Sequence, residues 1–530
     1  MVDNKTSFWD FDVKIINKWN LSEVLLFAGI FASLLWSVYF SFVTLLIPYQ
    51  IELHEGTAQV QTWFFLRGEN PFVLENQPLG MNNYGMGYSL AVLPFAALFG
   101  NTLLVHRSVT FGFIVLCALT GFFVVYRARK DVLFALACAA FIVVGLIARG
   151  GIGAFPAAMG TFLFLAAMLI PFVRSFDMSS LILSVLISLA AFYTKPYFVL
   201  SFGIVDSYLF FFVSKRKGIV YGGSFIAAFA ALFLVVRSIF PAYFIDTILG
   251  NVSNSSIRFG HLVDQLIELF FNFYPITIFL FAAILTGSWG KDSQVPYRRK
   301  IMKKMNFFGW DRPLIDRSVG YVFYSFVCAF MAFVFILGGH IGNYMNYAYH
   351  LIVPLFFCWV FCEVVSRNKM KFFLALAVIL NLFVWGGKLL NPDMLKQNDS
   401  EEWGELFGYV RSSEHILNSP TVVSEVVALG LTPMDSGQTV FFYNVEPYPD
   451  NLLTTIPFDA LRVDGFQYER MTDRLIEKQR FDLIVTMKGK RSFYTHELVE
   501  DSYSLVSEIT VDMPLVGEHW TMLVWKPSVE

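Results

Sequence analysis

Long apolar segments alternate with short polar segments along most of the chain. From about residue 22 onward, runs of roughly 18 to 25 residues carry little charge, which is the length that crosses the hydrocarbon core of a bilayer. This pattern predicts a mainly α fold, a polytopic bundle of transmembrane helices. The predicted spans, about eleven in number, lie near 22–48, 103–126, 132–148, 155–173, 179–194, 196–213, 219–239, 263–288, 318–339, 345–365 and 371–387.

One apolar piece, 78–100, is ambiguous, because it reads either as a full span or as a half-embedded helix. The choice decides the side of every later loop. With a half-embedded helix, the positive-inside rule is satisfied by four basic loops at once. These loops are 127–130, 215–217, 290–317 and 367–371. We therefore predict that the first outer loop, 49–102, contains juxtamembrane helices and lies outside the cytoplasm.

The two ends of the chain differ from the apolar middle. Residues 1–20 are polar and carry Lys5, Lys14 and Lys18, which predicts a cytoplasmic amphipathic N-terminus. Residues 21–390 form the predicted transmembrane domain. Residues 391–530 are charged and punctuated, and they predict an extracytoplasmic α/β domain of their own. Its strand-like runs are 420–429, 438–444, 482–488 and 521–527.

Composition narrows the class of function. The chain is 56% hydrophobic and 15% charged, with a formal net charge of -2, which gives no reason to expect a nucleic-acid partner. The five cysteines all fall in apolar segments, where they predict packing and no disulfide framework. The sequence has no Walker A motif, no GxSxG elbow, no HExxH and no CxxC pair.

Three ionisable residues follow the first span, where a polar group needs water, a partner or a ligand. Glu52 and Glu55 are three positions apart, so on a helix they share one face, while His54 points elsewhere. One interpretation is a solvated turn beside the membrane. The other is a carboxylate that removes a proton from an acceptor hydroxyl or amine.

Lys195 is the second candidate, since it precedes Pro196 between two apolar runs and so cannot lie inside a regular helix. It is either a lysine that snorkels at a helix end or a cation for a phosphate. Further polar residues at outer helix ends and loops have the same two interpretations, packing or ligand binding. They are Arg149, Arg258, His261, His340, Asn343, Asn346 and His350.

Taken in order, these segments resemble the GT-C membrane glycosyltransferases, in particular the bacterial branch near protein O-mannosyltransferases and lipid A aminoarabinose transferases. The resemblance is carried by 55-EGTAQVQTWFFLRGENPF-72 and 84-YGMGYSLAVLPFAALFG-100, with 127-RARK-130, 194-TKP-196 and 343-NYMNY-347. It covers about residues 20 to 390, and the tail resembles the outer α/β domain of the same branch. The chain departs from the pattern at His54, where many members have Asp, and in 149–158, which has no acid.

The resemblance implies inverting transfer of a sugar from a polyprenyl-phosphate donor to a glycan, lipid or protein of the cell envelope. It implies Glu55 as the catalytic base, with Glu52 as the nearest substitute. Lys195 and Arg149 would hold the donor phosphate. His340, Asn343 and Asn346 would face the donor head group, and His54 and Arg258 are further candidates for donor binding. No cofactor is implied, and a divalent metal is left open.

Two other functions fit the same pattern. A flippase or transporter of a lipid-linked intermediate would bind a similar substrate without reacting, but it should show internal repeats and polar residues at mid-membrane depth. We find no clear repeat. An oligosaccharide ligase or polymerase would differ in its outer loops, which the sequence alone separates poorly. In each case the expected location is the bacterial inner membrane, with the site on the periplasmic face.

Overall fold

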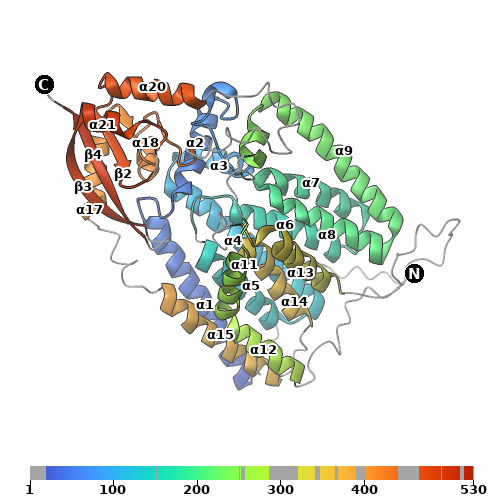
Figure 1. Cartoon of the computed structure of the whole chain (residues 1–530). Helices are drawn as coiled ribbons and strands as arrows, with labels where there is room; N and C mark the ends of the chain where they lie inside the picture. The colour runs from blue at the N-terminus through green and yellow to red at the C-terminus, as the bar shows by residue number, and fades with distance from the viewer. Residues whose placement is uncertain are drawn as a thin grey trace.

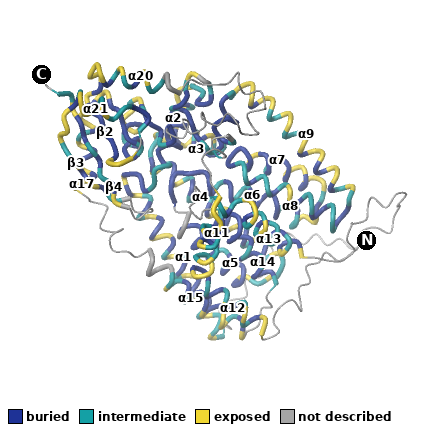
Figure 2. Tube along the Cα trace, viewed as in Figure 1, coloured by how far each residue is buried: buried dark blue, intermediate teal, exposed yellow. Residues whose placement is uncertain are grey.

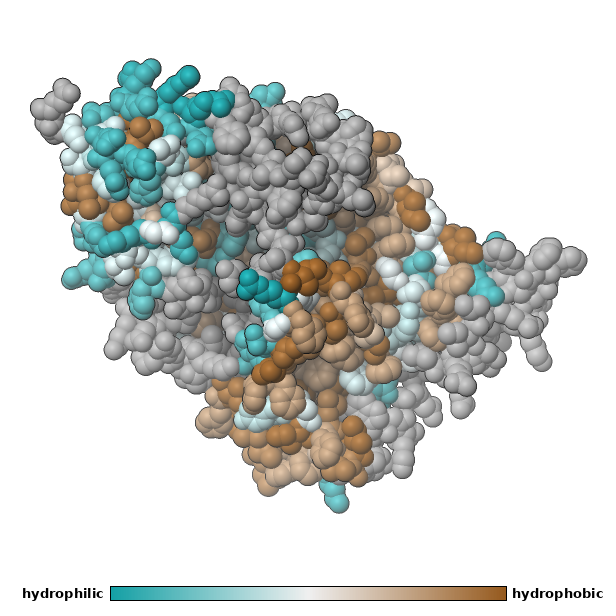
Figure 3. All heavy atoms as spheres, in the orientation of Figure 1, coloured by the Kyte–Doolittle hydropathy of each residue, from teal (hydrophilic) through white to brown (hydrophobic). Residues whose placement is uncertain are grey.

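The computed structural model describes residues 20–150, 152–249, 251, 257–285, 320–340, 347–363, 368–389, 401–439, 465–490, 492–513 and 518–528. Helices from the first three quarters of the chain form a bundle, and a smaller α/β domain lies at one end of it, beside α2 (Figure 1). Hydrophobic side chains cover much of the helical part, whereas hydrophilic side chains gather over the α/β domain (Figure 3).

Over the described residues, the predicted spans coincide with a helix or with a helix and its extension, except for 263–288, which falls on two helices, Phe259–Asn272 and Tyr274–Leu285, joined at a 71° bend. The long helices of the bundle are α1 (Leu21–Leu46), α4 (Leu103–Arg129), α5 (Val132–Gly150), α6 (Ala157–Val173), α7 (Met178–Thr194), α8 (Leu200–Tyr208), α9 (Lys215–Ile239), α11 (Phe259–Asn272), α12 (Tyr274–Leu285), α13 (Tyr321–Ala332), α14 (Val353–Glu363) and α15 (Asn368–Leu389). Short 3-10 or π-helical turns extend several of them: η2 (Pro196–Val199), η3 (Leu209–Val213), η5 (Phe333–Leu337) and η6 (Ala348–Ile352). Another π-helical turn, η4 (Ile245–Leu249), lies between α9 and α11.

The described helices include several that can cross a membrane. Four stretches are long and apolar enough alone: Leu21–Leu46, Leu103–Arg129, Pro196–Val213 and Lys215–Ile239. A fifth is the pair α11 and α12, which is bent by 71° at its break. Six shorter apolar helices pack among them. Their buried hydrophobic side chains form one large core cluster, while large apolar residues such as Phe31, Leu234 and Phe281 stay exposed. In Figure 2 buried stretches run through the middle of the bundle. The protein is an integral membrane protein.

The ambiguous piece contains α3 (Gly87–Phe99), a helix of 13 residues. At 1.5 Å per residue such a helix is about 20 Å long, shorter than the roughly 30 Å core of a bilayer. Its length therefore fits the half-embedded alternative. The rest of the loop 49–102 consists of α2 (His54–Leu66), the short turn η1 (Leu74–Asn76) and connecting turns.

The C-terminal domain contains a four-stranded sheet of order β1-β2-β4-β3, with only β1 and β2 parallel. Its elements are α17 (Glu401–Arg411), β1 (Ile416–Leu417), α18 (Val423–Ala428), α20 (Gly465–Glu477), β2 (Leu483–Met487), α21 (His496–Ser502), β3 (Tyr503–Met513) and β4 (Glu518–Pro527). Buried residues of neighbouring strands face each other in register, as Val485 does Val524. The mainly α fold with a C-terminal α/β domain is confirmed.

The strand predictions had mixed outcomes. The runs 482–488 and 521–527 are confirmed by β2 and β4, while β3 was not predicted. The prediction for 420–429 is wrong, because this stretch forms the helix α18. Val423 and Val427, one helical turn apart, pack against Val60, Trp63 and Phe64 of α2, so tertiary packing overrides the β propensity of valine. Most of 438–444 lies outside the described residues.

Candidate functional site

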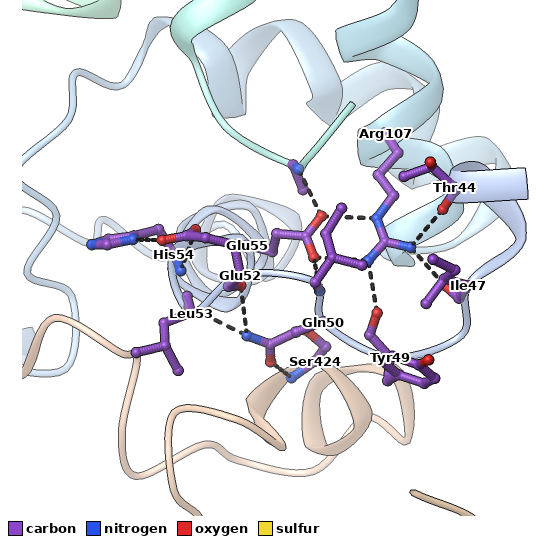
Figure 4. Close-up of polar contacts among 12 residues, drawn as sticks. Thr44, Ile47, Tyr49, Gln50, Glu52, Leu53, His54, Glu55, Arg107 and Ser424 are labelled. Carbon is purple, nitrogen blue, oxygen red and sulfur yellow. Dashed lines mark hydrogen bonds and ion pairs between the residues drawn. The ribbon is translucent and has the colours of Figure 1, made fainter. Parts of the chain in front are cut away.

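The loop 49–102 and the C-terminal domain pack against each other. Tyr49, just after the first span, stacks on Trp403 with ring centroids 4.6 Å apart. Gly56 on α2 lies so close to the domain that a Cβ there would be 1.9 Å from a methyl group of Val423. The Gln50 side chain also accepts a hydrogen bond from the Ser424 backbone at 3.1 Å (Figure 4). The turn after the first span, which carries Gln50 and the acidic residues, therefore packs directly against the C-terminal domain.

Glu55 is fully buried, and every direction around its carboxylate is occupied. Arg107 of α4 donates to both carboxylate oxygens, at 2.8 and 2.7 Å. The backbone N–H groups of Ile51 and Ala154 donate to them as well, each at 2.8 Å. Arg107 is also fully buried, and its remaining donors reach the carbonyl oxygens of Thr44, Ile47 and Tyr49. This pair locks the end of the first span to α4 and to the turn before α6.

Glu52 and His54 lie on the other side of the same turn. In Figure 4 the Glu55 side chain points toward Arg107, while Glu52 and His54 point away from it and toward each other. Glu52 accepts the backbone N–H of His54 at 2.8 Å, and its other oxygen is paired with the ring Nδ1 of His54. Both side chains are about one-fifth exposed, at 21% and 20%. Of the two acids, Glu52 is the one open to a ligand.

Lys195 ends α7, and only 6% of it is exposed. Its Nζ lies 4.3 Å from the ring centroid of Tyr84, 5.7 Å from that of Tyr197 and 6.0 Å from that of Tyr347. Within the described part of the chain, no hydrogen-bond acceptor lies against Nζ. A buried ammonium surrounded by rings but lacking an acceptor is a suitable group for an anionic ligand.

A glycine turn brings Tyr84 over Lys195. The N–H of Gly85 donates to the carbonyl of Thr194 at 3.0 Å, and a Cβ on Gly85 would lie 1.9 Å from the carbonyl oxygen of Tyr193. Only glycine permits so close an approach of the two backbones. On the other side, the Tyr84 ring lies 5.9 Å from the ring of His54. The turn therefore places Tyr84 between the Glu52–His54 pair and Lys195.

Burial changes the acid strength of Lys195, which lies between α7 and the candidate span Pro196–Val213. Loss of solvent lowers its pKa to about 8, and the negative charge of Glu52 opposes this shift. Lys195 is therefore a cation whose charge depends on pH near neutrality. The interaction also indicates that Glu52 and Lys195 belong to one electrostatic site.

The remaining predicted residues fall into three sets. Arg258 and His340 are brought together, because the Arg258 N–H donates to Gly339 at 2.8 Å and Ile257 forms a bridge with His340. Among the described residues, neither Arg258 nor His340 has a hydrogen bond or ring contact with Lys195 or with the three tyrosines around it. Asn343, Asn346 and the Arg149 side chain lie outside the described residues. His350 is buried on η6, with Nδ1 at 2.9 Å from the hydroxyl of Thr161.

The sequence reasoning missed Arg107 and the three tyrosines. Arg107 had a signal, since a lone arginine near the start of an apolar span needs a buried partner. Tyr84 had a weaker signal in its Gly-Met-Gly context. Tyr197 and Tyr347 had none, because 23 tyrosines occur in the chain. Among the described residues, no group of three or more His, Cys, Asp or Glu side chains is arranged to hold a metal ion.

The fold is similar to that of a solved membrane protein. The chain superposes on the crystal structure of ArnT from Cupriavidus metallidurans bound to undecaprenyl phosphate, with a TM-score of 0.56 and 11% sequence identity. The match covers 94% of this chain and 98% of that chain. No family model and no curated protein matches the sequence. The likeness is one of fold, and it confirms the GT-C architecture predicted from the sequence.

Proposed function

We propose that the protein is a GT-C glycosyltransferase, which moves a sugar from a polyprenyl-phosphate carrier to an acceptor of the cell envelope at the outer face of the membrane. The observation that carries the proposal is the buried ammonium of Lys195, which has no acceptor among the described residues and which interacts electrostatically with Glu52, an acid that is about one-fifth exposed. The ArnT fold supports it, because that structure contains undecaprenyl phosphate. The positive-inside pattern of the basic loops supports the outer face.

In this proposal Lys195 binds the phosphate of the donor and Glu52 is the catalytic base. The acceptor oxygen attacks the anomeric carbon, and the bond from that carbon to the phosphate oxygen breaks. The electron pair of this bond goes to the phosphate, which leaves as the prenyl phosphate and is stabilised by the Lys195 ammonium. The acceptor proton goes to Glu52, which His54 holds in place. The acceptor and the leaving group are on opposite faces of the sugar, so the configuration is inverted.

Glu55 has a different role in this proposal from the base that the family resemblance implied. A general base needs an oxygen within reach of the acceptor proton. Four donors already occupy the Glu55 carboxylate, and its side chain is not exposed. We assign Glu55 to positioning, since it fixes the turn that carries Glu52 and His54.

Release of bare prenyl phosphate distinguishes transfer from transport. Purified protein is incubated with prenyl-linked sugars that are extracted from cells that naturally make the protein. Membranes from cells that lack the protein are added as the acceptor. We expect turnover to convert the sugar-loaded lipid to bare prenyl phosphate, measured by mass spectrometry, only when acceptor membranes are added. If the protein binds the loaded lipid but leaves its sugar–phosphate bond intact, a transporter is the better assignment.

The charge of Lys195 predicts a pH dependence of donor binding. Because burial lowers its pKa to about 8, the free protein loses the cation as pH rises through that value. The apparent dissociation constant for undecaprenyl phosphate should then rise about tenfold per pH unit above 8. The second phosphate pKa is about 6, so the lipid itself does not titrate in this range.

Lys195→Arg is the matched variant for this measurement, because arginine stays charged at every accessible pH. Its affinity for undecaprenyl phosphate should be flat between about pH 7 and 10, whatever its absolute value. An affinity of the wild-type protein that is equally flat would show that Lys195 does not bind the phosphate.

A further inference from the structure

One loop of the C-terminal domain, residues 434–439, lies directly against the turn that carries Glu52 and His54. The Thr57 hydroxyl on α2 donates to the Ser436 carbonyl at 2.7 Å. Gly437 follows with a φ of +89°, and a Cβ there would lie 3.1 Å from the carbonyl oxygen of Leu53. The loop also holds itself, since the Gly437 N–H donates to Asp435 at 2.8 Å. This loop, residues 434–439, borders one side of the site, and we call it the wall.

Gln438 projects its amide from this wall to the first outer loop. The residue is fully buried, and its Oε1 accepts the backbone N–H of Asn83 at 2.6 Å. Because a backbone N–H only donates, the amide oxygen must face Asn83 and the amino group must face away from it. Among the described residues, Nε2 is buried and has no hydrogen-bond partner. Leaving a buried donor without a partner is destabilising, so its presence calls for an explanation.

Asn83 provides the complementary atom. Its backbone is held from two sides, since the Asn251 amide donates to its carbonyl at 2.7 Å and Gln438 accepts from its N–H. Its side-chain Oδ1 is buried and has no partner within the part of the chain that the structure describes. One amide thus offers an unused donor and the neighbouring amide an unused acceptor. Both carry no charge.

The amide pair lies beside the cation of the site. Asn83 is joined directly to Tyr84, whose ring covers the Lys195 ammonium at 4.3 Å. The wall that carries Gln438 rests on Leu53, between Glu52 and His54 in the chain. Both amides therefore border the residues that surround Lys195, Glu52 and His54, on the side where a sugar attached to a phosphate held by Lys195 would extend. A charged phosphate suits the lysine, and a neutral hydroxyl suits the amides.

We infer that Gln438 and Asn83 bind a hydroxyl of the donor sugar, so that the C-terminal domain contributes a specificity-determining residue. A hydroxyl both donates and accepts, and so it satisfies Nε2 of Gln438 and Oδ1 of Asn83 together. This inference rests on the proposed function, since it places the sugar by means of its phosphate. It predicts that the protein prefers sugar-loaded prenyl phosphate to the bare lipid and that Gln438 contributes to this preference.

Gln438→Glu separates sugar binding from a purely structural role. Glutamate keeps the acceptor for the Asn83 N–H and loses only the donor. The protein is incubated with the lipid extract of its natural cells, and the retained lipids are analysed by mass spectrometry. We expect the ratio of sugar-loaded to bare prenyl phosphate on the protein to fall roughly tenfold in the variant. The added negative charge cannot imitate this result, because it repels the doubly charged bare lipid more than the loaded one.

Two further variants complete the test. Thr57→Val removes a hydrogen bond between the same wall and α2 without touching the amides, and its ratio should equal that of the wild-type protein. Gln438→Met removes donor and acceptor without adding charge, and it should lower the ratio as Gln438→Glu does. If the ratio is unchanged in both Gln438 variants, the amide does not bind the sugar. If the wild-type protein retains no prenyl lipid at all, the proposed function fails instead.

Discussion

Replacing Glu52 by glutamine is expected to lower the rate of sugar transfer by a factor of about 10² to 10⁴, the usual contribution of a general base. Glutamine has the same shape and still accepts the N–H of His54, but it cannot take up the acceptor proton. Because Glu52 is partly exposed and its side-chain hydrogen bonds within the described residues go to His54, the melting temperature should stay close to that of the wild-type protein. Release of bare prenyl phosphate measures the rate.

Glu69→Gln is the matched control for this substitution. Glu69 is an acid of the same loop, 40% exposed and paired with Arg67, and it lies outside the site. The control removes the same charge from the same loop and should transfer sugar at the wild-type rate. Transfer by Glu52→Gln at a rate close to that of Glu69→Gln would show that Glu52 is not the base.

Replacing Arg107 by methionine is expected to destabilise the protein by about 3–5 kcal/mol, the range for breaking a buried ion pair by removing one partner. The change leaves the Glu55 carboxylate charged and fully buried. It also removes the donors to the carbonyl oxygens of Thr44, Ile47 and Tyr49. We expect a sharp loss of folded protein in detergent, measured by size-exclusion chromatography and by thermal unfolding.

Arg67→Met is the control for the arginine, since Arg67 is paired with Glu69 at an exposed position where an ion pair contributes at most about 1 kcal/mol. Glu55→Gln should destabilise the protein as Arg107→Met does. The amino group of the glutamine would face N–H groups that need an acceptor. A folded, thermally unchanged Glu55→Gln protein that has lost transfer would favour Glu55 as the base and contradict the positioning role.

The sequence was sufficient for the architecture because the bilayer imposes a strong local rule. Each span must be apolar over its own length, so helices such as α4 and α9 are visible from their residues alone. The short α3 fits the half-embedded helix that was predicted from the charges of the four basic loops that follow it. The helix α18 could not, since its valines take their conformation from contact with α2, far away in the chain.

The site was only partly predictable for a similar reason. The sequence identified the acidic turn and Lys195, which carry local signals. It could not separate Glu52 from Glu55, because the difference between them is made by Arg107, 52 residues after Glu55. The place of Gln438 depends on the packing of a separate domain, 355 residues after Asn83. Roles that depend on such distant partners do not appear in the spacing of a short motif.

The contact between α2 and the C-terminal domain has a consequence for the biogenesis of the protein. The turn after the first span is made early in synthesis. The residues that pack on the helix α2 next to this turn include Val423, and the wall that borders the site includes Gln438. Both are synthesised after the last described helix of the bundle, α15. A nascent chain therefore contains Glu52 and Lys195 before the segments that complete the site around them exist. Assembly of the site is thereby delayed until the C-terminal domain has been synthesised.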